Sequence, residues 1–456
     1  MSEEVYTITN PWKFMTEDFF IEKLINLGFP KEVVSIKVIK KDQMTFEVEL
    51  YFKIPEIGTK FYNKYNGKLF GFQNYKLNII KGKTNKKLNE NNKNEKEITY
   101  SDNYESWIDT HYMRKINEEG LILVNPQQKE IQKIMIKNII HIIKTPYIKG
   151  HNIINYLFPI TAYDKRTLLQ VFAYELREAP YIINKINYIL DPVEKLKNMS
   201  SFLISQIYLS PLRIKPFNPL LGETFQIKIG NLNCYFEQSM INPPTTNIYC
   251  FDTDGLYKIY GYISLYIKTG INNCKVLKKG NLYIEYNNGQ KYKIYYPSYY
   301  IGGVTIGKRS FNVRDSSLII DETNRLVSFI KFYNKNKHYN NIYPDEFEGN
   351  LISINEIKID NKGAKHLILE EDTIPLAKFD GEWTNELRFG NKIYWKRNKN
   401  NLYKLYESGY KLKSDSSLRP DLKLYNENNL KLAENTFYEL HKKQIKDFKL
   451  RNNYKK

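Results

Sequence analysis

The chain has 456 residues, of which 42% are hydrophobic and 26% are charged. These values are typical of a globular protein long enough for two domains, and they exclude a chain that is disordered throughout. The 69 lysines and arginines exceed the 50 aspartates and glutamates, giving a formal charge of +19 that favours an anionic partner, either a nucleic acid or an acidic membrane. The abundance of Ile, Asn, Lys and Tyr leaves a second interpretation open, in which the surplus only reflects an AT-rich coding sequence.

The cysteines and the N-terminus indicate the compartment. Cys234, Cys250 and Cys274 are the three cysteines of the chain and form no CxxC pair, which predicts neither a disulfide framework nor a zinc site and favours the reducing cytoplasm. The segment MSEEVYTITN has no basic region followed by an apolar one, so it is not a secretory signal. Since no apolar run approaches the roughly 18–20 residues that a membrane span needs, we expect peripheral membrane association at most.

Residues 1–118 predict a separate N-terminal domain. Residues 18–29 and 104–116 have the pattern of helices, and residues 33–54 alternate as a β-hairpin does. A pleckstrin-homology-like module and another small α/β domain both fit this order of elements.

The segment 125–146 predicts an amphipathic helix. Its apolar stripe, at a spacing of three to four residues, consists of Ile131, Ile134, Met135, Ile139, Ile142 and Ile143. Its opposite side carries Gln132, Lys133, Lys137, His141 and Lys144. Considered alone, the pattern favours an ordinary core-facing helix, although a lid or a segment that docks on an interface has the same pattern.

Helices and then many short strands follow. Residues 163–187 and 191–209 read as helices, the second beginning at Asp191-Pro192 with aspartate as the cap. Between residues 225 and 333, short alternating runs separated by Asn-Gly, Asp-Gly and Asn-Asn turns indicate an antiparallel sheet rolled into a barrel or a sandwich. A barrel of this many strands is too wide for its own side chains to fill, so it would enclose a cavity. The last forty residues return to basic, amphipathic helix.

Two motifs in the middle of the chain carry a resemblance to a known family. KPFNPLLGET (215–224) resembles the fingerprint of the oxysterol-binding-protein-related family, and EQSMINPP (237–244) stands where that family has EQVSHHPP. Further segments resemble the family in the same order along the chain, namely residues 158–176, 191–205, 296–308, 379–387 and 414–434. The resemblance covers about residues 125–450, and it predicts that residues 125–456 form the lipid-binding domain.

The resemblance implies an α+β fold. Its main part is a large, incomplete antiparallel β-barrel around a lipid tunnel, with an N-terminal lid helix, a helical segment before the barrel and C-terminal helices; the extra N-terminal domain adds to it. The helix at residues 129–144 would then be the lid or lie next to it. Members bind sterols or phospholipids, and many also bind phosphatidylinositol 4-phosphate and exchange the two lipids between membranes. We therefore expect an intracellular lipid-binding or lipid-transfer protein that works at anionic membrane surfaces, with no catalytic residue, metal or cofactor.

The residues of the phosphate site are only partly present. By resemblance, Lys215 contacts the lipid phosphate and Asn218 supports the turn that carries it. The two histidines of the family motif are replaced by Ile241 and Asn242, of which only the asparagine can donate a hydrogen bond. Since charge-assisted phosphate contacts contribute roughly 1.5–3 kcal/mol each, this predicts a degraded site for phosphatidylinositol 4-phosphate.

The C-terminal helix departs from the family in the same direction. The family has a Lys, a Glu and an Arg spaced four residues apart, and these positions fall here on Phe437, His441 and Ile445. A shift of one residue in the alignment would instead bring in Lys442 and Lys446.

Other functions are supported less well by the sequence. It contains no GxSxG or HExxH motif, and its six histidines are scattered, which argues against a hydrolase. The positive charge motivates a nucleic-acid-binding protein, but no RNP, KH, helix-turn-helix or zinc-finger signature supports one. A membrane tether or lipid sensor that binds lipid without moving it stays as the main alternative to a transfer protein.

Overall fold

The structure is a computed structural model, and the chain folds into two compact units, residues 1–94 and 95–456. It describes residues 4–8, 34–40, 46–52, 55–66, 79–83, 112–115, 120–123, 128–144, 157–211, 215–270, 272–332, 342–353, 357–358, 368–369, 374–398, 401–409 and 411–453.

The first unit contains a four-stranded antiparallel sheet with strand order β2-β3-β1-β4 and a helix, α2, that packs on it. The elements are β1 (Glu4–Ile8), β2 (Val34–Lys40), β3 (Phe46–Phe52), α2 (Pro55–Tyr65) and β4 (Ile79–Lys83). Pairing of β2 with β3 confirms the hairpin predicted for residues 33–54, whereas the helix predicted for residues 18–29 lies outside the described residues. A pleckstrin-homology-like fold for this region stays a prediction.

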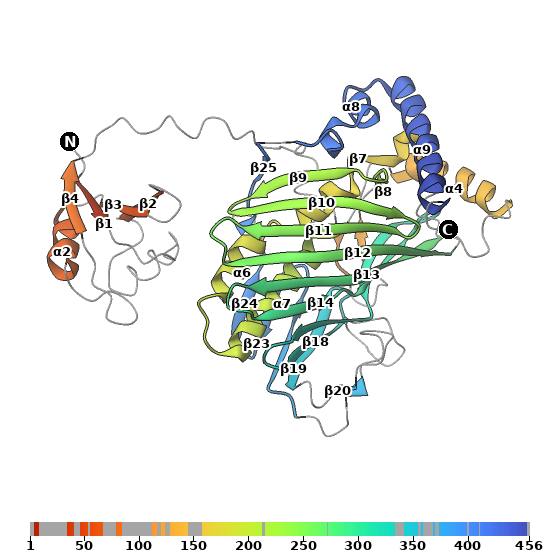
Figure 1. Cartoon of the computed structure of the whole chain (residues 1–456). Coiled ribbons are helices and arrows are strands. Elements are labelled where there is room, and N and C mark those ends of the chain that lie inside the picture. The colour runs from red at the N-terminus through yellow and green to blue at the C-terminus, as the bar shows by residue number, and fades with distance from the viewer. Residues whose placement is uncertain are drawn as a thin grey trace. The chain divides into compact units, whose positions relative to one another are not determined.

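The second unit is built on a long antiparallel sheet that curves into an incomplete barrel (Figure 1). Its strands are β5 (Tyr112–Met113), β6 (Leu121–Leu123), β9 (Thr224–Ile229), β10 (Leu232–Ile241), β11 (Pro244–Asp252), β12 (Tyr257–Thr269), β13 (Asn273–Tyr286), β14 (Lys291–Tyr295), β15 (Ser298–Gly302), β16 (Arg309–Arg314), β17 (Ser316–Asp321), β18 (Leu326–Phe332), β19 (Glu346–Ser353), β22 (Ala377–Glu382), β23 (Glu386–Phe389), β24 (Lys392–Lys396) and β25 (Leu405–Glu407). Outside it, β7 (Tyr163–Thr167) pairs in parallel with β8 (Lys215–Phe217), and β20 (Ile357–Lys358) pairs with β21 (Ile368–Leu369).

The order of the strands explains the shape of the sheet. Neighbouring strands from β9 to β13 pair in chain order, and β13 then pairs with β14 along one half and with β15 along the other. One branch continues through β17, β18, β19, β22, β23 and β24, and the other through β16, β6 and β5. Strand β10 alternates as predicted, with Cys234 and Phe236 buried and Tyr235 exposed. The many-stranded antiparallel sheet predicted between residues 225 and 333 is thus confirmed.

Helices lie within the curve of the sheet and at one end of it (Figure 1). They are α4 (Gln128–Lys144), η4 (Ile160–Ala162), α5 (Leu168–Glu175), α6 (Ala179–Ile186), α7 (Pro192–Leu209), η8 (Ser416–Leu418), α8 (Pro420–Asn426) and α9 (Leu430–Asn453). Helix α7 starts as predicted, because the Asp191 side chain accepts hydrogen bonds from the amides of Val193 and Glu194. Its residues from Met199 to Leu209 are buried, and the helix contacts β17, β18, β19, β23 and β24.

Two predicted helices are wrong in part. The helix predicted for residues 163–187 begins only at Leu168, because Tyr163–Thr167 form strand β7. Residues 104–116 were expected to be helical, but Tyr112 and Met113 form strand β5 and pair with Leu123 and Ile122 of β6. Tertiary pairing overrides the local helical pattern here, since the backbone hydrogen bonds of this segment go to a strand of the barrel.

A buried ion pair joins the inner helices to the sheet. Lys278 of β13 lies 2.7 Å from both carboxylate oxygens of Glu175 at the end of α5, and their side chains are 6% and 5% exposed. Ser210, after α7, donates to Glu175 at 2.9 Å. Burial alone would lower the pKa of Lys278, but the neighbouring carboxylate of Glu175 raises it, so Lys278 stays protonated.

Candidate functional site

Three motifs meet at one corner of the second unit, two of them neighbours in the sequence and the third, the SDSSLRPD segment, far along the chain. The amide of Gly222 in the KPFNPLLGET motif donates to the carbonyl of Gln238 in the EQSMINPP motif at 2.8 Å, and the amide of Gln238 donates to the carbonyl of Glu223 at 2.9 Å. The amide of Thr224 donates to the carbonyl of Ser414, at the start of the SDSSLRPD segment, at 2.9 Å. Gly222 has φ +79°, a conformation that favours glycine at this turn.

Arg419 holds this corner together by bridging two buried carboxylates. Its Nη1 donates to Glu223 Oε2 and to the carbonyl of Asn218, both at 2.9 Å, while its Nε and Nη2 donate to Asp421 at 3.0 and 2.6 Å. Glu223 Oε2 also accepts from the amide of Leu220 at 2.8 Å. Burial alone would lower the pKa of Arg419, but the two carboxylates raise it, so the guanidinium is a permanent charge.

Lys215 is attached to the same turn. Its Nζ donates a hydrogen bond to Asn218 Oδ1 and lies 4.6 Å from the centre of the Tyr163 ring. Desolvation by burial lowers the pKa of Lys215 to about 7. Lys215 and Asn218, the two residues predicted from the KPFNP motif, are therefore brought together.

His441 of α9 lies close to these cations. Its side chain is buried, its ring centre is 4.3 Å from that of Phe437, and its Nδ1 lies 2.8 Å from the carbonyl of Phe437. Among the described residues, Nε2 of His441 has no hydrogen-bond partner. Burial lowers the pKa of His441 to about 4, and the positive charges of Arg419 and Lys215 act in the same direction.

The other predicted headgroup positions differ in exposure. Ile241 is buried at the end of β10, and Asn242 is exposed in the turn to β11. Along α9, Phe437 is buried, whereas Ile445 is exposed. Lys442 and Lys446, which a shifted alignment would select, are also exposed. The side of α9 that faces the motifs thus carries His441 and Gln444, the latter accepting from the amide of Leu221 at 3.1 Å.

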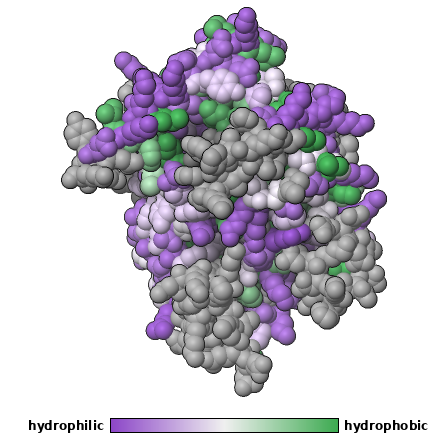
Figure 2. Space-filling model, turned by 90° about the vertical axis from the view of Figure 1, so that its right-hand side faces the viewer, coloured by the Kyte–Doolittle hydropathy of each residue, from purple (hydrophilic) through white to green (hydrophobic). Residues whose placement is uncertain are grey.

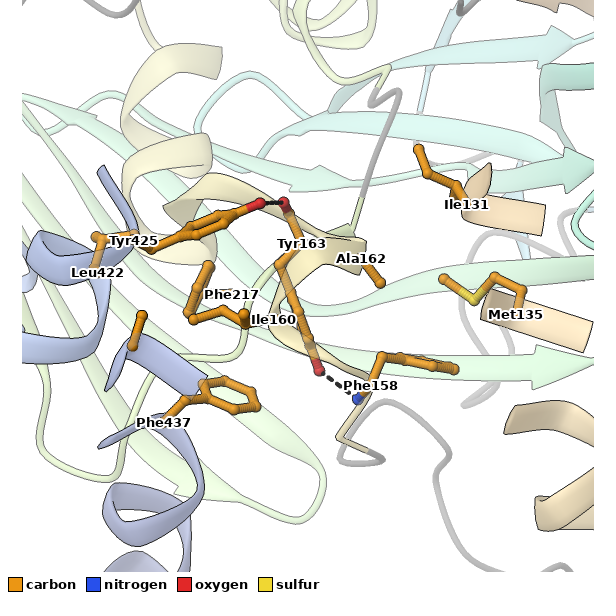
Figure 3. Packing of buried hydrophobic residues seen from close by; sticks show 11 residues of the cluster. Ile131, Met135, Phe158, Ile160, Ala162, Tyr163, Phe217, Leu422, Tyr425 and Phe437 are labelled. Carbon is orange, nitrogen blue, oxygen red and sulfur yellow. Dashed lines mark hydrogen bonds between the residues drawn. The ribbon is translucent and has the colours of Figure 1, made fainter. Parts of the chain in front are cut away.

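The predicted lid residues fall in α4. Ile131 and Met135 are buried and Ile134 is partly buried in one hydrophobic cluster with residues of the KPFNP motif and of α9 (Figure 3). The cluster consists of Ile131, Met135, Phe158, Ile160, Ala162, Tyr163, Phe217, Leu422, Tyr425, Ala433 and Phe437. Ile139, Ile142 and Ile143 also belong to α4, but their side chains lie outside the described residues.

This arrangement can bind an anion. Lys215 and His441 carry nitrogen donors or potential donors close to a permanent guanidinium, and a phosphate oxygen here would raise the pKa of both groups. The importance of Arg419 was missed from the sequence. The signal was the arginine of the SDSSLRPD segment, a residue type suited to bridging carboxylates.

A curved antiparallel sheet with inner helices and these converging motifs has the architecture that the sequence motifs indicate, that of a lipid-binding domain. The family model for oxysterol-binding protein matches residues 138–456, and the chain belongs to this family. Oxysterol-binding protein 9 of Dictyostelium discoideum is 28% identical over 260 residues, which are 54% of this chain and 59% of that protein. Oxysterol-binding protein-related protein 1 of Mus musculus is 27% identical over 138 residues, which are 29% of this chain and 14% of that protein. The match thus spans less than two thirds of the length of these relatives.

Solved structures share the fold. The Osh3 ORD of Saccharomyces cerevisiae, in complex with PI(4)P, has a TM-score of 0.53 and 18% identity, with coverage of 76% of this chain and 89% of that one. The Osh1 ORD domain in complex with cholesterol has a TM-score of 0.54 and 16% identity, with coverage of 73% and 89%. At this level of identity the likeness supports the fold alone.

Proposed function

We propose that this chain binds a sterol or another apolar lipid inside the barrel and carries it between membranes. The observation that supports this most is the family match over residues 138–456 together with the intact arrangement of Lys215, Asn218 and Arg419. Related domains have been solved with cholesterol and with PI(4)P. Such a carrier needs no catalytic group.

An apolar lipid needs a carrier because its surface is poorly solvated by water. A sterol-sized molecule hides on the order of 400–500 Å² of apolar surface, which corresponds to roughly 10 kcal/mol. It therefore does not leave a bilayer for water unaided, and a protein interior that excludes water lowers this barrier. In this proposal α4 is the lid, since Ile131 and Met135 belong to the same hydrophobic cluster as Phe217 of the KPFNP motif.

We further propose that phosphatidylinositol 4-phosphate binds weakly. Where the family has two histidines, this chain has the buried Ile241 and the exposed Asn242. Lys215 and the uncharged His441 are left to contact a phosphate, and His441 must take up a proton before it can donate from both ring nitrogens. The loss of charged donors weakens a phosphate site by orders of magnitude.

The protein would act at the cytoplasmic surface of membranes, as a peripheral protein. None of the helices in the described parts of the chain is long and apolar enough to cross a membrane. The surplus of positive charge, +19 for the whole chain, supports contact with anionic lipid.

Mass spectrometry of the lipids that co-purify with the protein, combined with transfer of a fluorescent sterol between vesicles, tests the function. We expect one lipid molecule per protein and saturable transfer. A protein that carries no lipid and extracts none from vesicles would overturn the proposal.

The phosphate site has its own test. Replacing Ile241→His together with Asn242→His should raise extraction of phosphatidylinositol 4-phosphate from vesicles. The matched control is Asn287→His with Asn288→His, which places two histidines in an exposed turn between β13 and β14. Submicromolar extraction of this lipid by the unmodified protein would contradict a degraded site.

A further inference from the structure

The turn between β15 and β16, residues 303–308, exposes an isoleucine at its tip. Ile306 is 68% exposed and Lys308 is also exposed, while Thr305 beside them is buried. Gly303 and Gly307 have φ of +63° and +82°, so the backbone bends sharply on both sides of the tip. A Cβ at Gly303 would lie 2.0 Å from the carbonyl oxygen of Lys308, so a larger residue does not fit there without a shift of the backbone.

Asn272, in the turn between β12 and β13, fixes this tip. Its Oδ1 accepts from the amides of Thr305 and Ile306 at 3.0 and 2.9 Å and from the Thr305 hydroxyl at 3.0 Å. Its Nδ2 donates to the carbonyl of Ile306 at 3.0 Å. The isoleucine is therefore held in solvent by hydrogen bonds on both of its backbone groups. Because the backbone of the tip is already ordered, it loses little further conformational entropy when a partner covers the tip.

The same turn holds helix α4. Nε2 of Gln132 donates to the carbonyls of Gly303 and Gly307 at 2.8 and 2.9 Å, and Nε2 of Gln128 donates to the carbonyl of Gly307 at 2.8 Å. Gln132 was expected on the solvent side of the helix, but it is buried, and the two carbonyls of the turn explain why burial is tolerated. The position of α4 thus depends on the shape of the 303–308 turn.

The charges around the turn identify the partner. Lys129, Lys133 and Lys137 of α4 are exposed, as is Lys308, and Glu130 forms an exposed ion pair with Lys133 at 2.8 Å. Apolar residues lie among hydrophilic ones over this end of the molecule (Figure 2). An apolar tip surrounded by lysines fits an anionic membrane surface, where the tip enters the interfacial region and each lysine near the surface contributes about 1 kcal/mol.

We propose that the 303–308 turn is the membrane-contacting element that releases α4. Insertion of Ile306 into an anionic membrane draws the turn away from α4, so that the carbonyls of Gly303 and Gly307 separate from Gln132 and Gln128. Helix α4 then keeps only its apolar contacts through Ile131 and Met135. This inference rests on the proposed lipid-carrier function, and it adds the surface at which the carrier docks and the contact through which docking opens it.

Vesicle flotation tests the docking. The full chain is compared with Ile306→Ser and with the control Ile374→Ser, which changes another exposed isoleucine, 83% exposed. On vesicles of phosphatidylcholine with phosphatidylserine, Ile306→Ser should lower the affinity about tenfold, as expected for an isoleucine that leaves water, and Ile374→Ser should not. Equal affinity of Ile306→Ser and the unmodified chain would overturn the proposal.

Hydrogen exchange of the α4 amides tests the release. Gln132→Met removes both donors at similar size and should raise exchange in residues 128–144 about fivefold without vesicles, whereas Lys133→Met, an exposed change in the same helix, should not. Anionic vesicles should raise α4 exchange in the unmodified chain but not in Ile306→Ser. Unchanged α4 exchange on vesicle binding would refute release. Failure of the carrier function is distinguished by mass spectrometry of the co-purifying lipids: an unmodified chain that neither binds vesicles nor carries lipid would overturn the proposed function itself.

Discussion

Replacing Arg419 with leucine should cost the second unit several kilocalories of stability. Arg419 is 4% exposed, and its removal leaves Glu223 and Asp421, which are 4% and 0% exposed, without their cation. Breaking a buried ion pair from one side costs about 3–5 kcal/mol, because the remaining charges stay desolvated. The carbonyl of Asn218 also loses a donor, so the turn that carries Lys215 should loosen.

The matched control is Arg388→Leu. Arg388 pairs with Asp380 at 3.0 Å, but the two side chains are 42% and 64% exposed, and a surface pair of this kind contributes about 0–1 kcal/mol. Urea unfolding followed by tryptophan fluorescence reports mainly on the second unit, which contains three of the four tryptophans, among them the buried Trp383 and Trp395. Equal midpoints for the two variants would refute the role given to Arg419.

The pH dependence of the Arg419→Leu variant provides a second check. Burial raises the pKa of Glu223, and in the unmodified chain Arg419 acts against this. A folded pKa above the unfolded one means that stability is present at low pH and is lost as the pH rises through the folded value. The deficit of the variant should therefore shrink as the pH falls from about 8 to about 5. A deficit that grows over this range would contradict the assignment.

Two further predictions concern buried ionisable groups. The folded pKa of His441 is about 4, below its ordinary value of 6.5, so the free energy of unfolding decreases as the pH falls from 6.5 toward 4. The variant His441→Phe lacks this group and should be spared about 3 kcal/mol of the decrease at about pH 4, as measured by urea titration. A variant with the same acid sensitivity as the unmodified chain would count against this. Lys278→Met should lower the free energy of unfolding by about 3–5 kcal/mol, because it leaves the buried carboxylate of Glu175 without its cation. Adding Glu175→Gln should restore most of this stability. A double variant as unstable as Lys278→Met would show that the loss has another cause.

Local sequence patterns were sufficient to predict most helices and strands, but not the contacts that their side chains make. The apolar stripe of α4 predicted the burial of Ile131 and Met135 correctly, since helical period alone determines which residues share a face. The same period predicted that Gln132 would be exposed to solvent. It is buried because its side chain donates to two backbone carbonyls, and nothing in the sequence of the helix indicates these partners. Its partners, Gly303 and Gly307, lie about 170 residues further along the chain.

The candidate site could be predicted only in part for a related reason. The KPFNP motif identified Lys215 and Asn218, which lie three residues apart and share a hydrogen bond. The hydrogen bond from Arg419 to the carbonyl of Asn218 joins residues 201 positions apart, and the burial of His441 depends on how α9 packs on the cluster around Phe217. Such contacts follow from the tertiary fold and not from local spacing.

The bridge from Arg419 to Glu223 also constrains the order of events during synthesis. The two residues are 196 positions apart, so a ribosome that has made the KPFNP turn must add nearly the whole barrel before the partner of Glu223 emerges. At about 5–20 residues per second this takes on the order of ten seconds or more. During that interval the carboxyl of Glu223 lacks its cation, and the turn cannot close in its final form. The corner formed by the KPFNP turn and Arg419 is thus among the last parts of the nascent protein to mature.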